Sequence, residues 1–184
     1  MPGRHTSRRN KAHKTYPYLL RNLTIDRPNQ VWATDITYIP LKKGYMYLVA
    51  IIDLNSRFVL NWSVSNSMDS SWCTKVLAQA IKEHGKPEII NTDQGSQFTA
   101  DEFSSFVLNQ EIKLSMDGKG RATDNAFIER LWRSVKYEKI YLNPPKDGMD
   151  LYLQLAEYFN FYNHERRHES LDYELPATKY LQAA

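Results

Sequence analysis

The chain has 184 residues, and its hydrophobic and charged fractions of 42% and 24% are close to those of ordinary globular proteins. Its single cysteine excludes an internal disulfide, and no apolar run approaches the roughly 20 residues that a membrane span needs, so we expect a soluble, cytoplasmic protein. The net charge of +3 is uneven, because residues 1–25 carry six basic residues and no carboxylate. Such an arm suits a phosphate backbone, although charge alone slightly favours a solvated tail.

The first third of the chain predicts an arm followed by a β-meander. Residues 1–28 show little periodicity, and we interpret them as a basic N-terminal arm that precedes a single catalytic domain over 29–184. Segments rich in β-formers and separated by short turns then predict three antiparallel strands, at 31–39, 45–53 and 57–64.

Helical and strand patterns alternate in the rest of the chain. Ser70 or Ser71 caps a predicted helix that ends at Gly85, and a short strand follows at 88–91. The remaining predicted elements are a helix that begins at Thr99, a strand at 112–115, a loop at 117–120, and helices at 124–140 and 147–162. This order predicts an α/β fold in which helices cover a mixed sheet.

Three carboxylates occupy positions that favour a functional site. Asp35 lies in the middle of the first strand among apolar residues, where an unpaired carboxylate costs several kcal/mol. Asp93 follows a short buried strand, and Glu129 lies on the polar face of the long helix. Each carboxylate also has an ordinary structural interpretation without a functional role. Asp35 is then an ion-paired or edge aspartate, Asp93 a turn aspartate, and Glu129 a solvated glutamate. Together they predict an oxygen-only site for Mg²⁺ or Mn²⁺, in which two ions can promote in-line phosphoryl transfer.

Four motifs in order carry a family resemblance, which covers roughly residues 15–183. They are Trp32-Ala-Thr-Asp35-Ile-Thr-Tyr38, Asn91-Thr-Asp93-Gln-Gly-Ser-Gln-Phe98, Asp124-Asn125-Ala126 with Glu129 and Lys136, and Tyr162-Asn163-x-x-Arg166-x-His168-x-x-Leu171 with Pro176. They resemble the integrase-like catalytic core encoded by the second reading frame of bacterial insertion-sequence transposases. The spacing from Asp93 to Glu129 is also typical of retroviral integrases.

The resemblance implies a ribonuclease-H-like fold with a five-stranded mixed sheet flanked by helices. It implies a transposase in which Asp35, Asp93 and Glu129 are catalytic and bind two Mg²⁺ ions, with Mn²⁺ as a substitute. The partners are then DNA, as transposon ends and target, and further copies of the chain in an oligomer on that DNA. We expect the DNA to contact Lys136, Asn125 and Arg133, with Lys119, Arg121, Arg130 and Lys139 adding charge nearby.

One departure and two alternatives accompany the resemblance. Family members usually carry a helix-turn-helix segment before this core, whereas only the short arm precedes Trp32 here, so we expect a truncated form. The first alternative is an inactive DNA-binding remnant of a transposase. The second is a ribonuclease H-type nuclease, a class that generally uses a fourth carboxylate.

Other patterns near the proposed site have simpler interpretations. His164-Glu-Arg-Arg-His168 matches the zinc-protease signature, but only sixteen residues follow it, too few for a third-ligand helix. A tyrosine recombinase is disfavoured by the strand-rich first half. We expect Asp53 to form a salt bridge with Arg57 rather than to bind metal, and Trp132 to pack in the core rather than to stack on a base.

Overall fold

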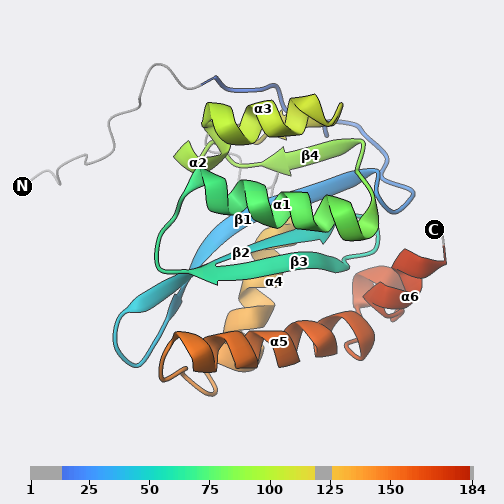
Figure 1. The fold of residues 1–184 in the computed structure, drawn as a ribbon. Coiled ribbons are helices and arrows are strands. Elements are labelled where there is room, and N and C mark those ends of the chain that lie inside the picture. Colours follow the sequence, from blue (N-terminus) through green and yellow to red (C-terminus); the bar gives the residue numbers. More distant parts are fainter. Residues whose placement is uncertain (1–13, 119–125, 183–184) are drawn as a thin grey trace, which may run out of the picture.

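The computed structural model describes residues 14–118 and 126–182. Its centre is a five-stranded mixed sheet with the strand order β3-β2-β1-β4-β5 (Figure 1). β2 is antiparallel to both neighbours, whereas β1, β4 and β5 are parallel, which confirms the predicted mixed sheet. The strands are β1 (Val31–Pro40), β2 (Tyr45–Asp53), β3 (Val59–Ser65), β4 (Ile89–Thr92) and β5 (Lys113–Met116).

Helices cover both faces of this sheet. In Figure 1, α1 lies in front of the strands, whereas α4 runs behind them and packs against β1. α3 packs against β5 and α5 against β3. The helices are α1 (Ser70–His84), α2 (Ser96–Thr99), α3 (Asp101–Asn109), α4 (Ala126–Val135), the π-helix η1 (Lys136–Ile140), α5 (Gly148–His164), the 3-10 helix η2 (Glu169–Leu171) and α6 (Pro176–Leu181).

Alternation along the strands divides the core into two halves. Trp32 and Ile51 pack with α1 and α3, whereas Ala33 and Ala50 pack with α4 and α5. Successive strand residues point to opposite faces. Asp35, two residues after Ala33, therefore belongs to the face that α4 covers.

Two predicted helices have different bounds in the structure. The helix expected to begin at Thr99 is α3, which begins at Asp101 because Ala100 has extended backbone angles and is its N-cap, and the short helix α2 that ends at Thr99 was not predicted. The helix expected over 124–140 is α-helical only to Val135, and its last turn is the π-helix η1. The 3-10 turn η2 and the helix α6, which has Pro176 at its first position, were not predicted.

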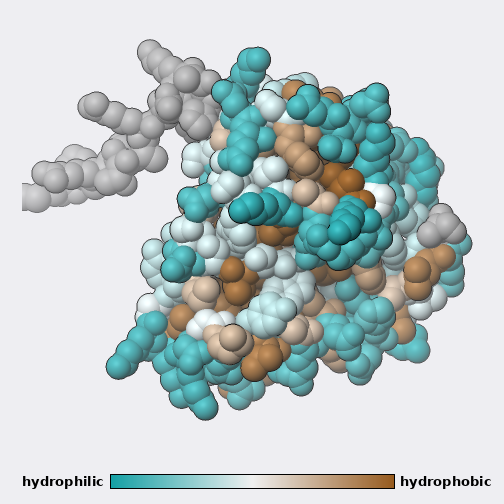
Figure 2. Space-filling view, viewed as in Figure 1, coloured by the Kyte–Doolittle hydropathy of each residue, from teal (hydrophilic) through white to brown (hydrophobic). Residues whose placement is uncertain are grey.

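The segment before β1 packs against the domain. Leu19, Leu20, Leu23 and Ile25 contact the core half on the α4 side, although they fall within the predicted arm. Residues 1–13 lie outside the described residues, and the boundary at residue 28 stays a prediction. Hydrophilic side chains dominate the face in Figure 2, with apolar ones scattered between them. None of the helices formed by the described residues has the length and apolar character to cross a membrane.

Candidate active site

The parallel strands place three aspartates side by side. In the pairs β1–β4 and β4–β5 the register is constant. The β1–β4 register, extended by two residues past Ala33 and Asn91, places Asp35 beside Asp93. The β4–β5 register, extended by one residue, places Asp93 beside Asp117. This row lies at the carboxyl ends of β4 and β5, the edge where α/β sheets build their sites.

Asp35 is held by a residue of α4. The indole Nε1 of Trp132 donates a hydrogen bond to Asp35 Oδ2 at 2.9 Å. Burial raises the pKa of Asp35 to about 6, the Trp132 hydrogen bond opposes that rise, and the negative charges of Asp93 and Asp117 add to it. The surroundings of Asp35 therefore disfavour its ionised form, an effect that a bound cation would offset.

Asp93 lies in the turn after β4. Its Oδ1 accepts a hydrogen bond from the backbone N–H of Gly95 at 2.9 Å. Burial raises the pKa of Asp93, and this hydrogen bond lowers it. A Cβ at Gly95 would stand 2.8 Å from Gln97 Nε2 and 2.9 Å from Asp93 Oδ1, so a side chain at this position would displace Gln97 and Asp93 from their present positions.

Asp117 is the site residue that sequence reasoning missed. It is buried, and its Oδ1 accepts a hydrogen bond from Asn91 Nδ2 at 2.8 Å. Ser115 Oγ donates to Asn91 Oδ1 at 2.7 Å and accepts from the N–H of Leu19 at 3.0 Å. The sequence predicts only a loop over 117–120, which begins at Asp117. The available signal was that Asp93 and Asp117 both follow their parallel strands, one residue beyond the end.

Lys136 joins the site from the start of η1. Its Nζ donates to Thr37 Oγ1 at 2.8 Å and lies 4.9 Å from the centre of the Tyr38 ring. Burial lowers the pKa of Lys136, and the negative charge of Asp35 raises it. Lys136 is thus fixed close to the first aspartate, on the same face of the sheet.

Glu129 lies at the edge of this arrangement. It is exposed in the first turn of α4, three residues before Trp132, a spacing that places both side chains on one side of the helix. Within the described parts of the chain, no three His, Cys, Asp or Glu side chains gather closely enough to hold a metal ion. The structure therefore brings Asp35 and Asp93 together, and it places Glu129 on α4, the helix that also carries the Trp132 bound to Asp35.

The remaining predicted DNA contacts lie in different surroundings. Arg130 and Arg133 are exposed on α4. Lys139 forms an ion pair with Glu157 of α5. Lys119, Arg121 and Asn125 lie outside the described residues.

The Asp53–Arg57 salt bridge was a wrong prediction. Asp53 is fully buried and accepts hydrogen bonds from the N–H of Asn29 at 2.7 Å and from the N–H and Oγ of Ser56 at 2.8 and 2.7 Å. The Arg57 guanidinium lies instead over the Phe127 ring, at 3.9 Å. Asp53 therefore stabilises a turn.

Two further interpretations are clarified by the structure. Trp132 is buried, as expected, and in addition binds Asp35. In the protease-like motif, α5 ends at His164, and His168 packs its ring edge-on against Tyr162 with a centroid distance of 4.7 Å. The two histidines therefore do not share the single helix that the zinc-protease signature requires.

The strand order, the antiparallel β2, the helices on both faces and the aspartates of β1 and β4 define a ribonuclease-H-like fold. The chain belongs to the integrase core domain family: residues 25–122 match one description of that domain and residues 110–176 match a second.

Named relatives agree with this assignment. The chain is 37% identical over 152 residues to the transposase for insertion sequence element IS904 of Lactococcus lactis subsp. lactis (strain IL1403), covering 81% of this chain and 60% of that protein. It is 34% identical over 147 residues to transposase InsF for insertion sequence IS3A of Escherichia coli (strain K12), covering 77% of this chain and 50% of that protein. The chain thus spans between half and three fifths of the length of these relatives.

Solved structures show the same fold. The HTLV-2 integrase catalytic core domain in complex with magnesium (dimeric form) superposes with a TM-score of 0.68 at 25% identity, covering 84% of this chain and 97% of that one. A chain of the simian T-cell lymphotropic virus intasome in complex with PP2A regulatory subunit B56 gamma has a TM-score of 0.74 at 22% identity, covering 93% of this chain and 60% of that one. The predicted relation to insertion-sequence transposases and retroviral integrases is confirmed.

Proposed function

We propose that this chain is the catalytic core of a transposase that cleaves DNA strands and transfers them to a target. The observation that carries the proposal is the pair of half-buried aspartates, Asp35 within β1 and Asp93 just after the adjacent parallel strand β4. Trp132 contacts Asp35 and Lys136 contacts Thr37 from the neighbouring helix. Relatives that bear the name transposase support it. In this proposal residues 29–184 form the core and 1–28 a basic arm.

Asp35, Asp93 and Glu129 are the residues that would hold Mg²⁺, with Mn²⁺ as a substitute. Their donors are carboxylate oxygens, which hard divalent cations prefer, and burial raises the pKa values of both aspartates. A related integrase core is named as a magnesium complex. When bound, two such ions supply activation of water or of a DNA 3′-hydroxyl and stabilisation of the departing oxygen.

The protein's own groups orient the site. Trp132 fixes one oxygen of Asp35, the Gly95 N–H fixes one oxygen of Asp93, and Lys136 places a cation nearby. We propose that Lys136, Asn125 and Arg133 position the DNA, while Lys119, Arg121, Arg130 and Lys139 add positive charge. Since Lys139 is paired with Glu157, we expect its contribution to be smaller.

The DNA partners would be transposon ends and a target duplex, bound by an oligomer of this chain. A neighbour named as an intasome supports assembly on DNA. The basic residues of the N-terminal arm supply charge for the phosphate backbone.

Asp117 favours a second candidate, a ribonuclease H-type nuclease. That class generally has a fourth carboxylate, and Asp117 is close enough to Asp35 to raise its pKa. The pattern around Lys136 and the transposase relatives favour the first candidate.

Nicking of supercoiled plasmid in Mn²⁺ tests the proposal, with an RNA–DNA hybrid as a second substrate. The wild type should nick DNA in preference to the hybrid, and Asp93→Asn should reduce nicking at least about 100-fold with an unchanged circular dichroism spectrum. Retained nicking by Asp93→Asn would contradict the assignment of Asp93 as a catalytic residue. Preference for the hybrid would select the ribonuclease, and DNA binding without nicking would select an inactive remnant.

A further inference from the structure

A basic pocket lies on the flank of α4 away from Glu129 and Lys136. Its volume is about 290 Å³, several times the ~30 Å³ that a water molecule occupies. No carboxylate is among the described residues that line it. Its lining includes Tyr162 and His168, together with four arginines and two serines: Arg57, Arg130, Arg133, Arg166, Ser134 and Ser170.

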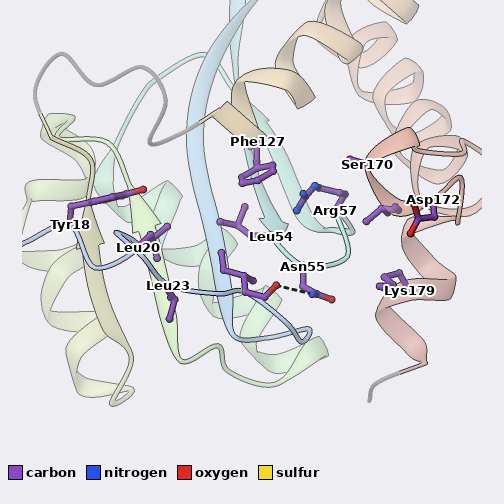
Figure 3. Close-up of a pocket in the computed structure, with 12 residues that line it drawn as sticks. Tyr18, Leu20, Leu23, Leu54, Asn55, Arg57, Phe127, Ser170, Asp172 and Lys179 are labelled. Atoms are coloured by element: carbon purple, nitrogen blue, oxygen red, sulfur yellow. Dashed lines mark hydrogen bonds between the residues drawn. The ribbon is translucent and has the colours of Figure 1, made fainter.

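Arg57 has an unusual conformation, and its guanidinium forms no ion pair among the described residues. It lies in the turn before β3 with a φ of 63°, a left-handed conformation that few non-glycine residues adopt and that often accompanies function. Figure 3 draws a second pocket, which shares Arg57, Phe127 and Ser170 with the basic one, and shows the Arg57 guanidinium beside Phe127, with Ser170 and Asp172 opposite on the C-terminal segment. Within the described parts of the chain, its side chain forms no hydrogen bond or ion pair, with Asp172 or with any other residue.

The charge of the pocket comes from three arginines. Arg166 is neutralised by Glu138, to which it donates two hydrogen bonds at 2.9 and 2.7 Å. Arg57, Arg130 and Arg133 have no such carboxylate among the described residues. Burial lowers the pKa of Arg57, Tyr162 and the charge of Asp53 oppose that shift, and the neighbouring charge of Arg130 adds to it. A half-buried guanidinium that faces other cations is an arrangement that an anion stabilises.

We propose that this pocket binds a phosphate group of the DNA backbone. Guanidinium groups match phosphate oxygens with paired hydrogen bonds, and the serine hydroxyls are further donors. Because an α-helix with its side chains is only about 10–12 Å wide, a duplex that crosses α4 can reach this pocket and the aspartates on its other side. This inference rests on the proposed function, which supplies DNA as the ligand.

Fluorescence anisotropy with a labelled 30-base-pair duplex tests the pocket, over a series of salt concentrations. The test variants are Arg130→Gln, which is exposed, and Arg57→Asn, because asparagine tolerates a positive φ. Lys75→Gln is the matched control, since Lys75 is exposed on α1 across the sheet. Each arginine variant should raise Kd about tenfold and reduce the salt slope by about one, and the control should do neither.

The outcomes separate this inference from the proposed function. Equal binding by the wild type and both arginine variants would overturn the phosphate pocket and leave the function intact. Absence of duplex binding by the wild type would overturn both. A further arm measures melting in inorganic phosphate: stabilisation of the wild type but not of Arg130→Gln, combined with equal duplex binding, would assign the pocket to free phosphate and overturn the DNA assignment.

Discussion

Replacing Asp35 with asparagine should stabilise the metal-free protein. The pKa of Asp35 is raised from its ordinary 3.8 to about 6 in the fold, mainly by burial. At about 1.4 kcal/mol for each pH unit, ionised Asp35 destabilises the fold by up to about 3 kcal/mol above pH 6. Asparagine does not ionise, and its carbonyl oxygen can still accept the hydrogen bond of Trp132.

The direction of the Asp35 pKa shift determines how the stabilisation by Asp35→Asn depends on pH. Because the folded-state pKa is the higher one, the folded state binds the proton more tightly, and the wild type loses stability as the pH rises from 3.8 to about 6. The advantage of Asp35→Asn should therefore be full at pH 8 and small at pH 4. Urea unfolding in EDTA, followed by circular dichroism, measures the difference in the free energy of unfolding.

A control and a metal arm complete this test. Asp101→Asn removes an exposed carboxylate from the first turn of α3, so it should change stability by no more than about 0.5 kcal/mol and in the opposite direction. Addition of Mg²⁺ should stabilise the wild type and leave Asp35→Asn unchanged, so the difference in unfolding free energy between the two proteins should become smaller. An Asp35→Asn protein no more stable than the wild type at pH 8 would refute the reasoning.

Three further substitutions test the packing around the site. Burial lowers the pKa of His168 to about 4, so protonation at lower pH destabilises the fold. Between pH 7 and pH 5 the unfolding free energy of the wild type, measured in urea, should fall by about 2 kcal/mol relative to His168→Gln. The same pH dependence of stability in both proteins would contradict this. Trp132→Phe keeps an aromatic ring but removes the donor to Asp35, so Mn²⁺-dependent nicking should slow about 10–100-fold, and an unchanged rate would exclude a positioning role. Tyr158→Phe removes a 2.8 Å hydrogen bond to Glu138 and should lower the unfolding free energy by about 1 kcal/mol, whereas a neutral result would mean that the bond contributes nothing.

The first half of the fold could be predicted because its pattern is local. Runs of β-forming and apolar residues define β1 and β2, and Asp35 stands out as a carboxylate within the first of them. Asp93 was found in the same way, at the end of a short apolar run beside Gly95.

Other parts depend on contacts between distant segments. The row that includes Asp117 follows from the register of β4 and β5, and the bond from Trp132 to Asp35 depends on how α4 crosses β1. Neither is encoded in a local pattern. The predicted salt bridge from Arg57 failed because backbone groups and Ser56 of the turn already satisfy the carboxylate of Asp53.

Strand transfer is the measurement that tests the central claim most directly. A labelled oligonucleotide with a free 3′-hydroxyl is incubated with supercoiled plasmid and Mn²⁺, and covalent incorporation of label is counted. The proposed function predicts that the wild type incorporates the label. It predicts that incorporation falls by about 100-fold or more in each of three variants, Asp35→Asn, Asp93→Asn and Glu129→Gln. Incorporation by Glu129→Gln at the wild-type rate would contradict the three-carboxylate site, and equal incorporation by all four proteins would contradict the proposed function itself.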